Sequence, residues 1–287
     1  MAMKENLRTL YGAGWLGWQM EANWTDPFLF MIYSVAKPVS AALILVLMYI
    51  VILGGVGIQG EAFAYIYLGN AFFIYVGQVL FGVTWVVHED REHYQTLKLI
   101  YISPISFFYY IIGRAGSKIL IATIAVIITL LFGVFVLGIP VDAVTMDWGL
   151  LALCLTVGMA CLVSIGIALA GITFLTAKHS GGINEGIAGL FYVFCGVVFP
   201  LTQLPTWGQS LGFAIPVTYW LEAMRRALLP GFQDLPLGTG MEGIPNFWLV
   251  MLLAASALFF YFLSILIFKL GDYLARRAGK IDMTTAY

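Results

Sequence analysis

Long apolar segments dominate this chain of 287 residues and decide what it can fold into. A helix needs about 20 mostly apolar residues to cross the hydrocarbon layer of a bilayer. Because hydrocarbon offers no partner to backbone N–H and C=O groups, such segments must be helical there. The sequence contains six of them, at residues 28–53, 62–87, 107–137, 149–177, 183–200 and 246–270. We therefore predict an all-α integral membrane protein with six transmembrane helices.

The composition excludes a soluble domain. The chain is 61% hydrophobic and 10% charged, whereas soluble domains are about 25% charged. The formal net charge is −1 and no block is rich in Lys or Arg, so nothing indicates a nucleic-acid partner. Cys154, Cys161 and Cys195 lie in apolar stretches without paired spacing, and we expect them to be free, buried side chains.

Lysine and arginine are distributed unevenly among the connections. They occur before the first span, in the second and fourth connections and after the sixth span, whereas the first and third connections carry only acidic residues. Since basic residues favour the cytoplasmic side, we predict a multi-pass protein of the cell membrane with both termini in the cytoplasm. Arg225 and Arg226, in the long fifth connection, are the exception to this pattern.

Residues 1–25 form a separate segment that is amphipathic rather than continuously apolar. The apolar residues that recur at helical spacing are Leu7, Leu10, Tyr11, Trp15 and Trp18. This pattern predicts a helix that lies in the cytoplasmic headgroup layer. Its role is either a simple membrane anchor or a lever that receives force from a partner. Asp26-Pro27 is expected to cap and begin the first span.

The second connection interrupts the apolar pattern with a short charged segment. Residues 89–102 are predicted to form one helix that ends before Ser103-Pro104, since proline disfavours helical geometry in the residue preceding it. Leu97, Ile100 and Tyr101 share one face of that helix, which suits a hydrophobic groove on a partner. The candidate coupling residues are Glu89, Arg91, Glu92, Thr96, Leu97, Lys98, Ile100 and Tyr101. The alternative interpretation is a solvated charged cap without a partner.

The fifth connection is long, apolar and divided by prolines. Two pieces within 200–227, Pro200–Leu211 and Leu211–Ala227, are too short to span and have the length of helices that enter the outer leaflet and return. Glu222 can neutralise Arg225 or Arg226 three or four residues later on one helix. This re-entrant hairpin is a candidate outer gate. Its candidate residues are Pro200, Pro205, Trp207, Pro216, Tyr219, Glu222 and Arg225.

Together these features resemble the permease subunit of ABC-2-type ABC transporters. Arg91, Thr96-Leu97 and the run 103–106, Ser-Pro-Ile-Ser, match the second connection of that family, although Gln95 stands where the family has glycine and places its tight turn in question. The resemblance implies a homodimeric or heterodimeric permease in contact with membrane lipids. It also implies a separate ATPase subunit that binds ATP and Mg, so that this chain holds no cofactor and is not an enzyme itself.

The sequence itself also gives no sign of an ATPase site in this chain. No GxxxxGK[ST] phosphate-binding loop is present. His88 and His93 are five residues apart and would lie on different faces of a helix, so no metal site is predicted. A secondary transporter would place charged residues near the middle of its spans, and a membrane-embedded enzyme would cluster acids or ligands; both remain alternatives. Short outer loops favour export of an amphipathic substrate, either drug-like, lipid or glycan-lipid.

Small residues offer surfaces for close helix approach between two copies of the chain. They include Gly158, Gly166 and Gly171 in the fourth span and Gly182 and Gly186 at the start of the fifth. A dimer is expected because one six-span bundle cannot enclose a path for a large amphiphile.

Overall fold

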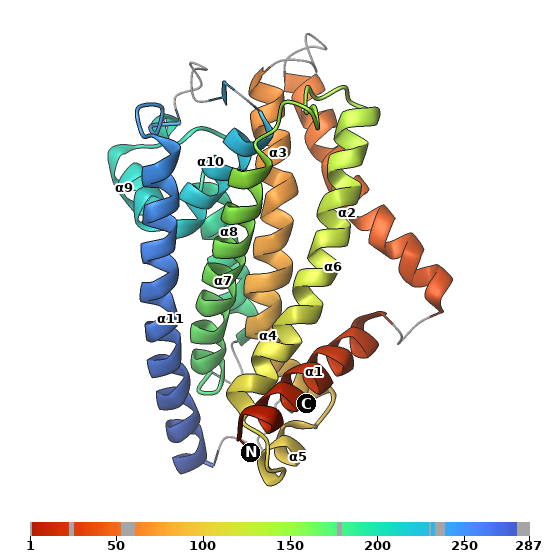
Figure 1. Ribbon diagram of the computed structural model, residues 1–287, viewed down its shortest axis with the longest axis vertical. Coiled ribbons are helices and arrows are strands. Elements are labelled where there is room, and N and C mark those ends of the chain that lie inside the picture. The colour runs from red at the N-terminus through yellow and green to blue at the C-terminus, as the bar shows by residue number, and fades with distance from the viewer. Residues whose placement is uncertain are drawn as a thin grey trace.

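A computed structural model describes residues 2–22, 26–52, 61–176, 180–229, 231–232 and 239–279, and every regular element in these ranges is helical (Figure 1). The first half of the chain forms α1 (Ala2–Ala22), α2 (Pro27–Ile52), α3 (Glu61–Tyr75), η1 (Val76–Phe81), α4 (Gly82–His88), η2 (Glu89–His93), α5 (Leu97–Ile102) and α6 (Phe107–Phe135). The second half forms α7 (Trp148–Thr173), α8 (Ser180–Phe194), η3 (Leu201–Gln203), α9 (Thr206–Ala214), α10 (Pro216–Leu228) and α11 (Asn246–Arg277).

Five helices in the described residues are long and apolar enough to cross a membrane: α2, the continuous stretch from α3 through η2, α6, α7 and α11. Their bounds lie within a few residues of five predicted spans, except that the second continues to His93 and the sixth to Arg277. The Asp26 carboxylate accepts a hydrogen bond from the Phe28 N–H at 3.0 Å, which confirms the expected cap of α2.

The predicted fifth span, 183–200, is shorter than expected. Helix α8 has 15 residues, and at about 1.5 Å per residue it does not cover the roughly 30 Å of a hydrocarbon core. It ends at Phe194 because Gly196 adopts φ 69°, in the left-handed region that stops a helix. The described residues therefore provide five candidate spans rather than six, and α8 reaches only part of the way.

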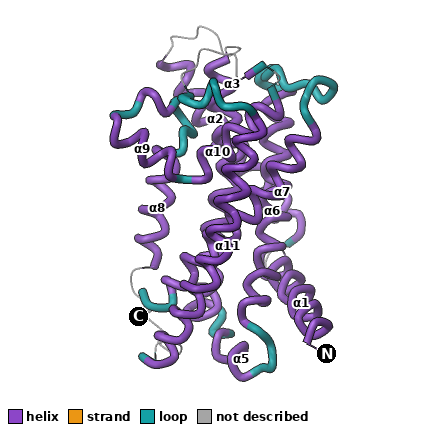
Figure 2. Tube along the Cα trace, turned by 60° about the vertical axis from the view of Figure 1, so that its left-hand side comes forward, coloured by secondary structure: helices purple, strands orange, loops and turns teal. Residues whose placement is uncertain are grey.

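The helices form an elongated bundle with a different set of short elements at each end. Helices α1 and α5 lie at one end, whereas α9 and α10 lie at the other, as both views show (Figures 1 and 2). The stretch from α3 to η2 is central: 61% of its most apolar 18 residues are buried, compared with 22% for α2 and 11% for α11. The outward residues of α2 and α11 are large and apolar, which suits contact with lipid.

Glycines of α7 pack against helices of the same chain. A Cβ on Gly271 of α11 would overlap the Gly171 backbone, so α7 and α11 cross in direct contact. Gly158 lies under the indole of Trp220, whose Nε1–H donates to the Cys154 carbonyl at 3.1 Å. The small residues of the fourth span thus serve packing within one chain rather than the predicted contact between copies. Gly182 and Gly186 of α8, in contrast, have open space beside them.

Gly158→Ala is expected to destabilise the protein, because a Cβ there overlaps the Trp220 ring, and overpacking of this kind costs about 1–3 kcal/mol. Thermal unfolding in detergent should show a lower Tm for this variant. Gly12→Ala is the matched control, since its Cβ meets nothing within 4 Å and its Tm should not fall. Equal Tm values for the two variants would contradict the packing described here.

Candidate functional site at the end that carries α1 and α5

The second connection is not one helix over 89–102, as predicted from its pattern. The π-helical segment η2 (Glu89–His93) continues the span above it, and α5 begins only at Leu97. Between them, Gln95 adopts φ 52°, a left-handed conformation that costs a side-chain-bearing residue about 1–2 kcal/mol. The tight turn of the family pattern is therefore present although glycine is replaced. Because of this break, Arg91, Gln95 and Lys98 share no helical face.

Helix α5 turns its predicted docking face toward its own bundle. Leu97 and Ile100 are 1% and 8% exposed, and they belong to a core cluster with residues of α4, α6, α7 and α11. The prediction that these two side chains meet a partner is wrong, because they cover the apolar base of the bundle. The outward face instead carries Lys98 with two exposed apolar residues, a third follows in the connection to α6, and these four define the α5 patch. The patch consists of Lys98, Leu99, Ile102 and Ile105. As predicted, α5 ends before Ser103, which is extended with ψ 153°.

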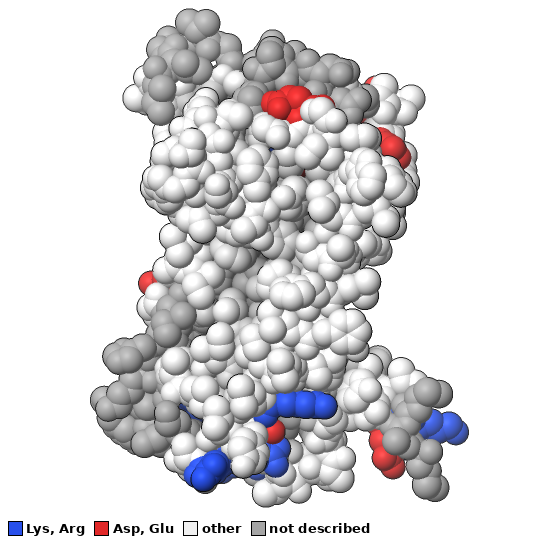
Figure 3. Space-filling model, turned by 90° about the vertical axis from the view of Figure 1, so that its left-hand side faces the viewer, with Lys and Arg blue, Asp and Glu red and all other residues white. Residues whose placement is uncertain are grey.

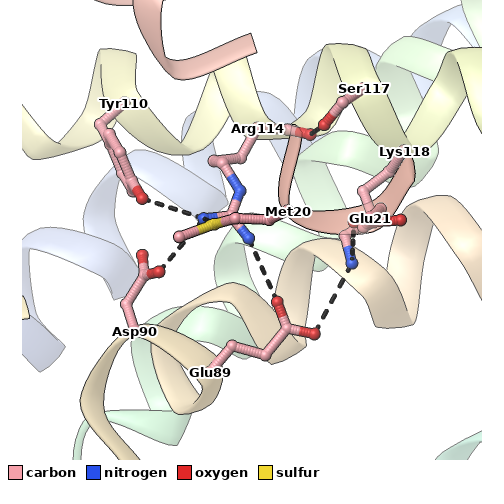
Figure 4. Close-up of polar contacts among 8 residues, drawn as sticks. All are labelled: Met20, Glu21, Glu89, Asp90, Tyr110, Arg114, Ser117 and Lys118. Atoms are coloured by element: carbon pink, nitrogen blue, oxygen red, sulfur yellow. Dashed lines mark hydrogen bonds and ion pairs between the residues drawn. The ribbon is translucent and has the colours of Figure 1, made fainter. Parts of the chain in front are cut away.

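A buried group of charges, here called the ion cluster, joins α1, η2 and α6 (Figure 4). It consists of Glu21, Glu89, Asp90, Arg114 and Lys118. The Arg114 side chain is completely buried; Nη1 donates to Asp90 Oδ1 at 3.1 Å, and Nη2 donates to Glu89 Oε2 at 3.2 Å. Nη1 also lies 3.0 Å from the Tyr110 hydroxyl oxygen, one turn earlier on α6. Two parts of the chain separated by a connection thus meet in one charge-assisted network.

Lys118 extends the ion cluster to the N-terminal helix. Its ammonium lies 2.5 Å from Glu21 of α1 and 3.7 Å from Glu89 of η2. Close approach of α1 requires small residues, because a Cβ on Gly17 would meet Ser117 and Arg114, and one on Gly113 would meet α1. Two cations and three carboxylates therefore hold α1 against α6 at the level where span two becomes η2.

Sequence reasoning missed the central members of the ion cluster. Arg114 and Lys118 lie just after the second connection, and their charges were considered only as indicators of membrane orientation. The signal that could have found them is two cations four residues apart inside an apolar span, with an acidic pair at the end of the preceding span. Of the predicted coupling residues, Glu89 is in the cluster, whereas Arg91 pairs with Glu92 at 3.0 Å and both side chains are buried. Thr96 precedes α5 but makes no capping hydrogen bond.

Tyr101 fixes α5 to the C-terminal part of α11. Its hydroxyl donates to Asp272 at 2.5 Å, and the Arg276 guanidinium lies 4.7 Å from the centre of its ring. Arg276 also binds the same carboxylate at 3.0 Å. Burial, followed by the hydrogen bond to Asp272, raises the pKa of Tyr101 above its ordinary value near 10. The hydroxyl therefore stays protonated and remains a donor at physiological pH.

The candidate outer-gate residues lie at the opposite end and do not form a single cluster. Glu222 pairs with Arg226 at 3.0 Å and not with Arg225. Arg225 donates to the Gly196 carbonyl at 2.8 Å and lies 3.6 Å from the ring of Tyr65. The Tyr219 hydroxyl donates to the Phe213 carbonyl at 2.6 Å. Trp207 points outward and is 61% exposed. Each proline lies at the start of a helical element: Pro200 precedes η3, Pro205 precedes α9 and Pro216 begins α10. The two predicted pieces of the hairpin are therefore divided at Ile215 rather than at Leu211.

In the part of the chain that the structure describes, no three His, Cys, Asp or Glu side chains come together as metal ligands would. His88 packs edge-on against Trp85 and His93 against Tyr94, so the two histidines do not face a common site.

Comparison with protein families gives a match to the ABC-2 type transporter family over residues 15–229. The chain belongs to this family. A search of curated proteins gave no match. An ABC-2 type transporter generally combines such a membrane component with an ABC ATPase subunit. The matched region contains α5, the ion cluster and the α9–α10 pair, whereas α11 lies beyond it.

Arg114→Met is expected to destabilise the protein by about 3–5 kcal/mol, because it leaves the Asp90 carboxylate buried without its cation. Thermal unfolding in detergent should show this loss. The double variant Arg114→Met with Asp90→Asn should lose less than the sum of the single variants, as expected for directly coupled residues. Arg276→Met is the control, since its ion pair is 57% exposed on the arginine side and should cost at most about 1 kcal/mol. Additive losses would show that the ion cluster is not a unit.

Proposed function

We propose that this chain is the transmembrane permease subunit of an ATP-driven exporter, which moves an amphipathic substrate outward. The substrate is drug-like, a lipid or a glycan-lipid. A separate ATPase subunit binds ATP and Mg and supplies the energy, and two permease copies form the path. The chain lies in the cell membrane with both termini in the cytoplasm.

The observation that carries this proposal is the α5 patch. Leu99 is 56% exposed and Ile102 is 82% exposed, although α5 lies at the charged end of the bundle. On the face drawn in Figure 3 the Lys and Arg side chains gather at that same end, and a wide band without them follows. Outside a membrane, a compact apolar patch beside charges is typical of a protein-binding surface. A short helix that presents this patch fits a groove on an ATPase subunit.

A second surface beside the α5 patch extends the proposed docking site. A groove of about 510 Å³ lies between α1 and the connection after α5. Glu5 and Arg8 of α1 line one side, and Pro104 and Ile105 line the other. Ile105 thus belongs to both the groove and the α5 patch. A partner bound here would contact α1 and α5 together, which favours the lever interpretation of α1 over a simple anchor.

The packing around α5 supports transmission of force into the bundle. Leu97 and Ile100 are embedded in the core cluster at its base, and Tyr101 is bonded to α11. The ion cluster connects η2 to α1 and α6. Displacement of α5 by an ATPase would therefore act on α6 and α11 through packed side chains, which deform little.

A dimer is supported by the open face of α8. Gly182 and Gly186 have no neighbour within 4 Å of a Cβ position, and such small residues permit close approach of a second helix. The proposed orientation is supported by the basic end of the bundle. Its apparent exceptions, Arg225 and Arg226, are buried and bonded to carbonyls and to Glu222.

Ile102→Asp is expected to abolish retention of the ATPase. The substitution places a charge in the centre of the α5 patch, and losing a central contact of at least about 2 kcal/mol weakens binding by roughly thirtyfold or more. The test is co-purification of the ATPase with the permease, followed by ATPase activity. Val144→Asp is the matched control, because Val144 is 88% exposed in the connection between α6 and α7 at the opposite end.

Both variants should fold, since neither residue is buried. Normal ATPase binding and stimulation by Ile102→Asp would refute the proposed coupling role of α5. Leu97→Asp is unsuitable for this test, because Leu97 is 1% exposed and the variant would disrupt the bundle itself.

Single-cysteine labelling tests the proposed orientation. Cys154, Cys161 and Cys195 are buried, and they can be replaced by serine or alanine to give a silent background. In intact cells, a membrane-impermeant maleimide should label Val144→Cys but not Ile102→Cys. After permeabilisation of cells that do not express the ATPase both should react, because both positions are exposed in the chain alone. The reverse pattern would place α5 outside and exclude coupling to a cytoplasmic ATPase.

A further inference from the structure

A second groove, here called the α1–α6 groove, lies on another side of α1 from the surface proposed to meet the ATPase. It has a volume of about 520 Å³ and an almost entirely apolar lining. Tyr11, Trp15 and Trp18 form its wall on α1, and Gly116 and Leu120 form its side on α6. A volume of this size lies within the range of about 300–1,000 Å³ that is usual for small-molecule sites.

The groove exists because the α6 residue at the centre of the groove is a glycine and has no side chain. Gly116 is exposed and a Cβ there would meet nothing within 4 Å, whereas Gly113, one turn away, is in direct contact with α1. Trp18 packs edge-on against Phe30 of α2, with ring centres 6.0 Å apart, and this contact bounds the groove toward α2. The result is an apolar channel between two helices rather than an enclosed cavity.

The groove continues into the lipid-facing surface of α6. From Leu120 a row of exposed residues follows at helical spacing, with Ile124, Ile127 and Leu131 all directed outward. In a membrane this row contacts acyl chains. A chain lying along the row would enter the groove without crossing polar surface. Among the described residues no segment occupies this space, and an apolar channel open to hydrocarbon is filled by lipid rather than by water.

Basic residues lie on α1 beside the aromatic wall. Lys4, Arg8, Tyr11 and Trp15 are spaced by four, three and four residues, so they share one helical face. Lys4 and Arg8 are exposed, and the structure gives neither an ion pair within the described ranges. Arg8 also borders the other groove, next to Glu5, but Glu5 lies on a different helical face from Tyr11 and Trp15, and Glu21 is paired with Lys118. The free charge beside the aromatic wall is therefore positive, which complements a phosphate headgroup.

We infer that the α1–α6 groove binds one anionic phospholipid of the membrane, with an acyl chain over Gly116 between Trp15 and Leu120 and its headgroup near Lys4 and Arg8. The bound lipid completes the contact between α1 and α6 next to Ser117 and Arg114. The inference rests on the proposed function only in assigning this lipid to the cytoplasmic leaflet.

Gly116→Leu tests the acyl-chain site, because a Cβ at this position meets nothing within 4 Å and the longer side chain would occupy the groove. The permease alone, without an ATPase, is reconstituted in nanodiscs with equal phosphatidylglycerol and phosphatidylcholine, released into mild detergent and analysed by native mass spectrometry. We expect retained phospholipid to fall about tenfold or more. Gly12→Leu is the control, because Gly12 is an equally open glycine of α1 that lines the other groove; it should retain lipid like the unmodified protein.

Two further variants keep the proposal falsifiable. Trp15→Ala removes a 58% exposed wall residue and should lower lipid retention several-fold even if Gly116→Leu folds poorly. Lys4→Gln with Arg8→Gln should retain lipid but lose the preference for phosphatidylglycerol, since two charges are removed. Unchanged retention in both Gly116→Leu and Trp15→Ala would overturn the acyl-chain site, and an unchanged preference in the double variant would overturn the headgroup assignment. Because no ATPase is present, these outcomes are independent of the proposed coupling.

Discussion

The end of the bundle that carries α1 and α5 depends on the hydrogen bonds made by one buried guanidinium, that of Arg114. Arg114 has no exposed surface and cannot lose its charge, so its donors must find acceptors from the protein. Its two carboxylate acceptors come from η2, which brings the end of span two to α6, and the Tyr110 hydroxyl supplies another acceptor from α6 itself. Lys118, one turn further along, recruits Glu21 in the same way and fixes α1. Removing only the cations or only the carboxylates of the ion cluster would destabilise the protein, because the remaining charges would lose their partners.

At the opposite end, most partners of the two buried arginines are backbone carbonyls, and only Arg226 also has a carboxylate. Arg225 binds carbonyls at the point where α8 ends, including that of Gly196. Arg226 binds the carbonyls of Met241 and Ile244 as well as Glu222. These helix-end and loop carbonyls lack intrahelical partners and would otherwise be unsatisfied in an apolar surrounding. The two arginines therefore hold the α9–α10 pair to α8 and α11, and they are not free charges of the kind that determine membrane orientation.

The sequence was sufficient to predict what apolar length and local chemistry determine. Five spans, the cap at Asp26 and the end of α5 before Ser103-Pro104 follow from such signals. The break of 89–102 was not predicted, because it depends on a left-handed conformation at Gln95, which a residue with a side chain rarely adopts. The same limit applies to the π-helical segments η1 and η2, since an inserted residue changes which side chains face inward.

The candidate site was predictable in position but not in orientation. Helical spacing identifies residues that share a face, yet it does not say whether the face meets a partner or the same chain. Leu97 and Ile100 were assigned to a partner and lie in the core, whereas Leu99 and Ile102 point outward. Arg114 and Lys118 could have been recognised from their depth in a span, but their acceptors are on two other elements. Pairings between distant segments leave little trace in a single sequence.

The contacts of α5 explain how so short a helix keeps its place at the base of the bundle. A six-residue helix is not stable alone, so α5 keeps its shape through Leu97 and Ile100 in the core and through Tyr101 on Asp272. Asp272 lies one residue beyond Gly271, where α11 crosses α7 in direct backbone contact. A force on the outer face of α5 is therefore opposed at a point where α11 cannot slide closer to α7.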